Sequence, residues 1–166
     1  SGALIGGITF DGKTDLSGIT DPNSTDGDSL GDNWENFYFG DLTTADNTTN
    51  SDTDGFSDLE EWNYFLSSAR MINPLDDDTD SDTLSDDAEV NTHDTDPTSN
   101  DSDSDDLPDG YEILNNLDPN LNSGNDGANG DPDLDTLDNI TEFGLGTHPN
   151  KDDTDEDGYK DSAENN

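Results

Sequence analysis

One twelve-residue pattern occurs six times in this chain and constrains its fold more than any other feature. From Asn50 to Glu61, oxygen-bearing side chains fall at positions one, three, five, nine and twelve, and Gly55 holds position six. The same spacing begins again at Ser24, Asp78, Asp101, Asp131 and Asp153. Oxygen groups repeated at this spacing predict short loops of backbone, each wrapped around a hard cation.

The residue types at the candidate ligand positions hardly vary among the six loops. Positions three and five are always Asp, and position twelve is always Glu. The side-chain ligands at positions one, three and five are Asn50, Asp78, Asp101, Asp131 and Asp153, then Asp26, Asp52, Asp80, Asp103, Asp133 and Asp155, then Asp28, Asp54, Asp82, Asp105, Asp135 and Asp157. Those at positions nine and twelve are Asp32, Asp58, Asp86, Asp109, Asn139 and Asp161, then Glu35, Glu61, Glu89, Glu112, Glu142 and Glu164. Position seven is expected to contribute its backbone carbonyl, from Leu30, Phe56, Leu84, Leu107, Leu137 and Tyr159.

The spacing is that of an EF-hand-type calcium loop, in which six to eight oxygens surround the ion at about 2.3 to 2.6 Å. One match could arise by chance in so acidic a chain, but six matches in phase could not. We therefore expect about six or more Ca²⁺ ions. The first loop is the weakest candidate, because Ser24 at its first position is a poor ligand.

Composition alone would suggest a different interpretation. The formal net charge is -40, and Leu, Ile, Val and Phe make up only 28 of 166 residues, a balance typical of a disordered acidic tail or of a protein adapted to high salt. Those alternatives explain the amount of charge but not its placement. The side-chain ligand positions of the six loops hold 27 of the 44 carboxylates, so the placement favours ion binding.

The charge also bears on partners and location. A strongly negative field repels nucleic acid and anionic membranes and attracts divalent cations, so we expect calcium as a partner and no nucleic acid. No apolar run approaches the roughly 20 residues of a membrane span, which argues against membrane insertion. Cytosolic calcium is too scarce to fill many weak sites, so we expect a secreted protein or one at the cell surface. The chain has no cysteine to form disulfides.

The expected fold is mostly irregular, with a small α content: a calcium-stabilised solenoid of Asp-rich loops and short helices. Residues 1–22 form a strand-like segment, in which ALIGGITF could pair with an edge of this protein or of a neighbour, and residues 23–166 form the array of six repeats. Each repeat is expected to comprise a loop, a helical turn beginning near position nine and an extended return strand containing an X-Pro pair. Because most loops lack glycine at position six, the sharp turn there is not expected in all of them.

Two apolar groups should supply packing. An aromatic cluster of Trp34, Phe37, Tyr38 and Phe39 is expected to cover the joint between the first two loops. The sequence predicts a helix over residues 58–70, stopped at Asn73-Pro74, with an apolar face of Leu59, Trp62, Phe65 and Leu66. Trp62 is interpreted as a packing residue rather than a sugar platform. The stretch NSGNDGANG is expected to be a flexible connection.

Position seven is apolar in every loop, whereas position eight is Gly31, Ser57, Ser85, Pro108, Asp138 or Lys160. Paired EF-hands and dockerins usually keep an apolar residue at position eight. With its 22- and 23-residue intervals, the pattern instead resembles thrombospondin type 3 repeats, as in DTDSDTLSDDAEVNTHDTDP, over about residues 24–164. The resemblance implies a chain wrapped around a line of calcium ions, acting as a structural or cell-surface element. The cysteines of that family are absent.

Three functions are compatible with the sequence, none of them catalytic. The first is a calcium-stiffened spacer or adhesive module in the extracellular space, in which neighbouring domains of a larger surface protein are the partners. The second is a protomer of a calcium-stabilised fibre, in which identical subunits are the partners. The third is a non-catalytic appendage of a secreted polysaccharide-degrading enzyme. His93 and His148 are the only histidines and are interpreted as ordinary loop residues, so we do not expect an enzyme.

Overall fold

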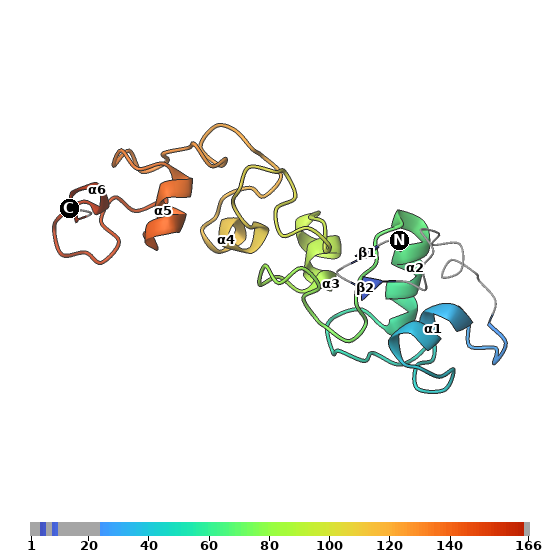
Figure 1. The fold of residues 1–166 in the computed structure, drawn as a ribbon. Helices are drawn as coiled ribbons and strands as arrows, with labels where there is room; N and C mark the ends of the chain where they lie inside the picture. The colour runs from blue at the N-terminus through green and yellow to red at the C-terminus, as the bar shows by residue number, and fades with distance from the viewer. Residues whose placement is uncertain (1–3, 6–7, 10–23, 165–166) are drawn as a thin grey trace. The chain divides into compact units, whose positions relative to one another are not determined.

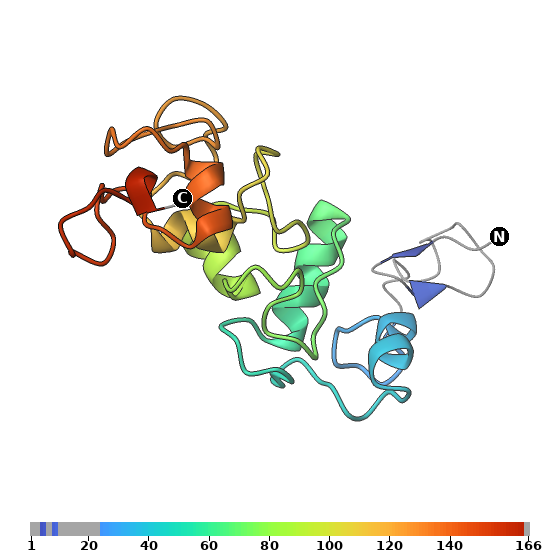
Figure 2. The ribbon, with the colours of Figure 1, turned by 60° about the vertical axis from the view of Figure 1, so that its left-hand side comes forward.

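A computed structural model of the chain describes residues 4–5, 8–9 and 24–164, and most of this structure is irregular. Short helices alternate with long connecting loops (Figures 1 and 2). The elements are β1 (Leu4–Ile5), β2 (Ile8–Thr9), α1 (Asp32–Tyr38), α2 (Asp58–Ser68), α3 (Asp86–Ala88), η2 (Glu89–His93), α4 (Asp109–Leu114), α5 (Asn139–Leu145) and α6 (Asp161–Glu164). The low helix content agrees with the fold expected from the sequence.

Each of the six α-helices begins at position nine of a loop, as the sequence predicts. The residue before the helix is extended in α2, α4 and α5, where Ser57, Pro108 and Asp138 occupy the N-cap. Ser57 and Glu60 form a reciprocal capping box, and Asp138 accepts a hydrogen bond from the Thr141 N–H. The acidic residues at positions nine and twelve therefore fall in the first helical turn, where the helix dipole favours negative charge.

The helix ends differ in part from the prediction. Helix α2 ends at Ser68, because Ala69 adopts the left-handed conformation with φ of 60°. The helix therefore stops before Arg70, and Pro74 is not its terminator. Helix α5 ends as expected at Gly146, with φ of 80°, while Gly144 lies inside the helix.

The X-Pro pairs form turns rather than the extended return strands that we expected. Four equivalent backbone hydrogen bonds close β-turns with proline at the second position. They run from Asp76 N–H to Asn73 O, Ser99 N–H to Asp96 O, Leu121 N–H to Asp118 O, and Lys151 N–H to His148 O. Each repeat thus reverses direction within four residues. Proline favours this because its ring presets the φ that the second turn position requires.

The loops turn sharply even where glycine is absent, so the expectation for position six was wrong. Position six has a positive φ in Ser29, Thr83, Asp106 and Thr136, as it has in Gly158. Position four is left-handed in all six loops (Gly27, Thr53, Ser81, Ser104, Leu134 and Glu156). For residues other than glycine this conformation costs about 1 to 2 kcal/mol each, so other interactions must hold the loops in this shape.

The chain divides into two compact units, and the third loop contributes residues to both. The first unit comprises residues 1–79 and 85–87, and the second comprises residues 80–84 and 88–166. The strands β1 and β2 belong to the first unit and pair antiparallel with each other, Leu4 opposite Thr9 and Ile5 opposite Ile8. The apolar run ALIGGITF therefore forms its pairs within itself.

The first unit has an aromatic core, as predicted. Trp34 packs against Trp62 with ring centroids 5.8 Å apart, and Leu30, Ala45 and Phe65 complete the buried cluster. Trp62 is 2% exposed, which confirms its packing role. Tyr38 and Phe39 pack against this cluster and Phe37 contacts Tyr38, so the four aromatic residues gather as expected. Leu66 is 44% exposed, so its placement on the apolar face was wrong.

The second unit has a smaller apolar core, formed by Leu107, Leu117 and Ala128 with Tyr111 and Ile140 packed against them. Ala128 comes from the Gly- and Asn-rich stretch for which we expected flexibility. That stretch is packed instead, because Gly127, Ala128 and Gly130 are all buried. Among the described residues, no helix combines the length and the apolar character needed to cross a membrane.

Candidate metal sites

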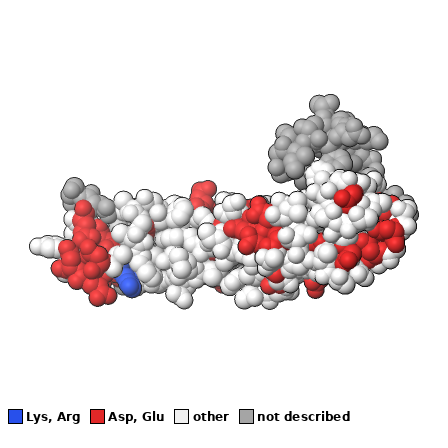
Figure 3. All heavy atoms as spheres, turned by 90° about the horizontal axis from the view of Figure 1, so that it is seen from below, with Lys and Arg blue, Asp and Glu red and all other residues white. Residues whose placement is uncertain are grey.

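The described interior holds more buried polar and charged residues than hydrophobic ones, 14 against 10. Eleven of the 14 are carboxylates, whereas the whole chain has four lysines and arginines. Basic side chains therefore cannot neutralise the buried acids. Acidic side chains also gather in several separate patches on the surface seen in Figure 3.

The position-twelve glutamates are the most deeply buried of these acids. Glu35, Glu112 and Glu142 are 0% exposed, and Glu61 is 1% exposed. In each of these four side chains, neither carboxylate oxygen has a hydrogen-bond partner in the structure. A buried carboxylate without a partner is strongly unfavourable. Eight buried oxygen atoms with this property indicate that the loops are shaped to hold a cation.

The electrostatics of these glutamates support this conclusion. Burial raises the pKa of Glu61 and of Glu112 to about 9, and nearby aspartates raise it further in the same direction. The same causes raise the pKa of Glu142 to about 8 and that of Glu35 to about 7. For Glu61 the neighbouring charges include Asp52 and Asp58 of the same loop. At neutral pH the loops therefore disfavour their own charge unless a cation is present.

Position three also directs oxygen atoms inward. Both carboxylate oxygens of Asp103, and Oδ2 of Asp52 and of Asp133, are buried without a hydrogen-bond partner. Carboxylate oxygens lie within 4.8 Å of one another in three sets, each drawn from a single predicted loop. These sets are Asp26, Asp32 and Glu35; Asp101, Asp103 and Asp105; and Asp131, Asp133 and Asp135.

Position five has two separate roles, one for each carboxylate oxygen. Its Oδ1 accepts a hydrogen bond from the N–H of position seven in all six loops, at 2.6 to 2.9 Å. Its Oδ2 accepts from the N–H of position ten of the next loop in three cases. These are Asp54 from Asp87, Asp82 from Gly110, and Asp135 from Ser162. Position five therefore shapes its own loop and joins it to the following one.

Position nine is held by position two, a residue that our reading of the sequence missed. In the fourth loop Asp109 Oδ1 accepts the Ser102 N–H at 2.9 Å, and Asp109 Oδ2 accepts the Ser102 hydroxyl at 2.6 Å. The same pair of bonds occurs in the first, second, third and sixth loops, from Thr25, Ser51, Thr79 and Thr154. We call this the position-two clamp. A hydroxyl at position two in five of the six loops was the available sequence signal.

The position-two hydroxyl also fixes the X-Pro turn that precedes its loop. Thr79 Oγ1, Ser102 Oγ and Thr154 Oγ1 each accept a hydrogen bond from the N–H of the residue before proline, at 2.8 Å in all three cases. One hydroxyl thus links the turn, the loop and the first turn of the helix. This connection explains why the loops of the array can keep one geometry although the intervals between them differ.

The third loop supplies oxygen atoms to a cluster that also contains a residue of the fourth loop. Asp78 and Asp86 belong to the first unit, whereas Asp80, Asp82, Leu84 and Glu89 belong to the second. Within the second unit, carboxylate oxygens of Asp82, Glu89 and Asp109 lie within 4.8 Å of one another, and all three side chains are buried. Neighbouring loops therefore bring acidic groups together as well as forming their own sites.

The first and sixth loops differ from the others. In the first loop, Ser24 Oγ donates toward Asp26 Oδ1 at 3.1 Å and toward Asp28 Oδ1 at 3.2 Å. A hydroxyl therefore occupies the place where the other loops have an Asp or Asn side chain. In the sixth loop, Tyr159 is 66% exposed and Glu164 is exposed, although Asp161 is buried. Position-five bonds and packing from a following loop bury the equivalent residues elsewhere.

Position seven is buried at Leu30, Phe56 and Leu107, partly buried at Leu84 and Leu137, and exposed at Tyr159. Its apolar side chain thus contributes to packing in most loops while its N–H is held by position five. The histidines act through hydrogen bonds in turns: His93 O accepts from the Asn120 side chain, and His148 Nδ1 accepts from the Asn150 N–H.

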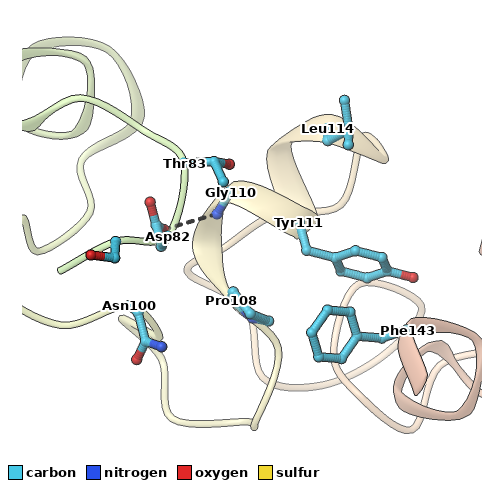
Figure 4. Close-up of a pocket in the computed structure, with 9 residues that line it drawn as sticks. Asp82, Thr83, Asn100, Pro108, Gly110, Tyr111, Leu114 and Phe143 are labelled. Atoms are coloured by element: carbon cyan, nitrogen blue, oxygen red, sulfur yellow. Dashed lines mark hydrogen bonds between the residues drawn. The ribbon is translucent and has the colours of Figure 1, made fainter. Parts of the chain in front are cut away.

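A cavity of about 300 Å³ lies beside one of the links between loops (Figure 4). Its wall includes Asp82, whose Oδ2 accepts the Gly110 N–H at 2.9 Å. Tyr111 and Phe143 form its aromatic side, with ring centroids 4.8 Å apart. Asp82 is the only charged residue that lines the cavity. The carboxylates of the candidate metal sites therefore face elsewhere.

Comparison with known proteins gives no relative for this chain. No family model, no curated protein sequence and no solved structure matches it.

Proposed function

We propose that the chain is an extracellular calcium-binding repeat module in which each of the six loops binds a Ca²⁺ ion and the bound ions hold the fold together. The observation that carries the proposal is the set of buried position-twelve glutamates whose carboxylate oxygens have no partner. A bidentate carboxylate at position twelve is the group that closes the coordination shell in an EF-hand-type loop. Calcium fits this donor set because every candidate ligand is an oxygen.

Bound ions would change the energetics of the fold in two ways. They would neutralise buried carboxylates that otherwise have raised pKa values, and they would compensate for the left-handed residues at positions four and six. Since the unfolded chain has no preformed sites, the free energy of binding becomes free energy of folding. We infer that the module works as a calcium-stiffened spacer, as the resemblance to thrombospondin type 3 repeats also suggests. Its location would be outside the cell, where calcium is abundant.

Thermal unfolding followed by circular dichroism tests this proposal. The chain is unfolded in millimolar calcium, in excess chelator, and in chelator with molar KCl. We expect a cooperative transition in calcium that is absent in chelator and is not restored by KCl. Magnesium at the same concentration should restore it poorly, because Mg²⁺ needs near-octahedral geometry at about 2.0 to 2.1 Å. Equal recovery in KCl would show that charge screening is sufficient and would refute the proposal.

A further inference from the structure

The fifth loop lacks both partners of the position-two clamp. Position two is Pro132, which has neither an N–H nor a hydroxyl, and position nine is Asn139 instead of Asp. Asn139 is nevertheless 0% exposed, like the position-nine aspartates of the second, third, fourth and sixth loops. Another part of the chain must therefore hold this side chain.

The segment before the fifth loop contains additional residues. The fourth and fifth loops start 30 residues apart, whereas the fifth and sixth start 22 apart. When the X-Pro turns at Pro119 and Pro149 are aligned, the eight additional residues are Ser123–Gly130. We call this segment the insertion.

Backbone carbonyls of the insertion surround the amide nitrogen of Asn139. Its Nδ2 donates toward Asn125 O at 2.9 Å, Asp126 O at 3.4 Å and Gly127 O at 2.9 Å. Three carbonyls can accept from the NH₂ group but cannot accept from a carboxylate, so the insertion selects an amide at this position. With Nδ2 held in this way, Oδ1 is buried and has no hydrogen-bond partner. The arrangement leaves Oδ1 as the atom that can face an ion.

The insertion also replaces the link between the fourth and fifth loops. Where other loops join position five directly to position ten, here Ala128 lies between them. Its N–H donates to Asp105 Oδ2 at 2.6 Å, and its carbonyl accepts the Ile140 N–H at 3.0 Å. Asn122, next to the insertion, donates from Nδ2 to Asp103 O at 3.2 Å. The segment thus contacts positions three and five of the fourth loop and positions nine and ten of the fifth.

Close packing explains why the insertion is rich in glycine. A Cβ atom on Gly127 would lie 2.4 Å from the Asn122 carbonyl carbon, and one on Gly130 would lie 2.5 Å from the Asn125 carbonyl oxygen. Both distances are far below van der Waals contact, so neither position accepts a side chain without rearrangement. The conformation that presents the three carbonyls therefore depends on these two glycines.

We propose that the insertion is a positioning element for the fifth metal site, in which its carbonyls orient the Asn139 amide so that Oδ1 faces the ion. It takes the place of the position-two clamp, and Pro132, Asn139 and Ser123–Gly130 act as one unit. This inference rests on the proposed calcium-binding function. It assigns Asn139 a neutral amide ligand and gives the connecting segment a direct role in ion binding.

A rescue experiment tests the proposal. Calcium is titrated into the wild-type chain, Asn139→Asp, Pro132→Thr and the Pro132→Thr/Asn139→Asp double variant, with the backbone amide signal of Leu137 in nuclear magnetic resonance spectra as the reporter of the fifth loop. In Asn139→Asp a carboxylate faces the insertion carbonyls, so the fifth site should bind calcium at least about tenfold more weakly, as is typical when outer-shell partners are lost. The double variant recreates the clamp of the other loops and should recover to within about threefold of the wild type.

Three outcomes separate the alternatives. Tight binding by Asn139→Asp alone, or failure of the double variant to bind better than Asn139→Asp, would overturn the inference. Weak binding by Asn139→Asp with recovery in the double variant would support it. If no loop of the wild-type chain binds calcium, the proposed function itself fails. If the other five loops bind and Asn139→Asp has no effect, only the inference about the insertion fails.

Deletion of the insertion provides a second test with its own rescue. Removal of residues 123–130 should abolish calcium binding at the fifth site, because it removes the three carbonyl acceptors. The same deletion in the Pro132→Thr/Asn139→Asp background restores both a 22-residue interval and the clamp, and should bind calcium there. The side-chain NH₂ signals of Asn139 in the wild-type chain should shift on calcium binding and exchange slowly with solvent. Unchanged signals would contradict the assigned role of Oδ1.

Discussion

The substitution Glu61→Gln should change the stability of the first unit in opposite directions with and without calcium. Glu61 is 1% exposed and neither of its carboxylate oxygens has a partner. Glutamine has nearly the same shape but no charge. It should therefore relieve the ion-free fold and impair the calcium-bound one, since it removes one charged oxygen ligand from the second loop.

The size of the ion-free effect follows from the pKa of Glu61. This pKa is about 9 in the fold, against 4.5 for an unperturbed glutamate. A group whose pKa is raised by folding contributes stability below its unfolded pKa and loses it as the pH rises through its folded pKa. At pH 7 the ion-free fold is therefore destabilised by about 3 kcal/mol at this residue, and the difference disappears near pH 4.5. Glu61→Gln should recover up to that amount.

Calcium reverses the comparison. An ion present at about 1,000 times its dissociation constant stabilises the wild-type fold by roughly 4 kcal/mol, and Glu61→Gln should lose most of this contribution. Plots of the free energy of unfolding against the logarithm of free calcium should therefore cross for the two proteins.

Urea unfolding at fixed free calcium provides the assay, with tryptophan fluorescence as the signal. Trp34 and Trp62 both lie in the buried cluster of the first unit, so the signal reports on that unit. A constant concentration of a stabilising osmolyte keeps the ion-free form folded enough to measure. The control is Glu60→Gln, because Glu60 is exposed and its hydrogen bonds to Ser57 lower its pKa. The control should cause a small loss of stability that is the same with and without calcium.

The reasoning would be refuted if Glu61→Gln lowered stability equally in chelator and in calcium. That result would mean that Glu61 stabilises the fold through contacts unrelated to an ion. A gain in chelator that did not depend on pH would also contradict the argument, because the gain is attributed to ionisation of the buried carboxylate.

Three further predictions follow from other parts of the sites. Calcium binding at pH 7 should release about one proton for each of Glu61, Glu112 and Glu142, whose pKa values of about 9, 9 and 8 keep them protonated without an ion; calorimetry in two buffers of different ionisation enthalpy measures this, and an enthalpy independent of the buffer would contradict it. Thr136→Gly should stabilise the calcium-bound chain by about 1 kcal/mol in urea unfolding, because Thr136 is exposed and has φ of 88°; a loss of stability would show that the left-handed backbone carries no strain there. Ser24→Asp should tighten calcium binding at the first loop by on the order of tenfold, since it supplies a charged ligand where a hydroxyl now lies; an unchanged affinity by calorimetry would mean that position one does not face the ion.

The sequence was sufficient to predict the features that depend on residue type and spacing. The start of every helix at position nine, the burial of the glutamates at position twelve and the packing of Trp62 all follow from the repeated pattern. These features are local, because a helix start requires only an N-cap and a first turn. The core around Trp34 was predictable for the same reason, since no other large apolar cluster exists nearby in the sequence.

Features that depend on which atom meets which could not be predicted in this way. Asp54 and Asp58 are both aspartates at candidate ligand positions, yet Asp54 Oδ2 reaches into the next repeat while both oxygens of Asp58 are held by Ser51. Gly55 was assigned to a sharp turn, but its space is required because a Cβ there would lie 2.0 Å from the Asp87 side chain. Such contacts arise from the stacking of one loop on the next, which spacing within a single loop does not specify.

The bond from position five to the following repeat gives the array a direction. Each loop lends a carboxylate oxygen to its successor and receives the same from its predecessor, so a repeat depends on what comes after it in a different way from what comes before. Loss of a later repeat would leave Asp54 or Asp135 with one acceptor exposed, whereas loss of an earlier one would free only an N–H group. Calcium depletion should therefore propagate through such an array like fraying of a rope from one end, and the end that gives way first is set by chain polarity rather than by the affinity of any single loop.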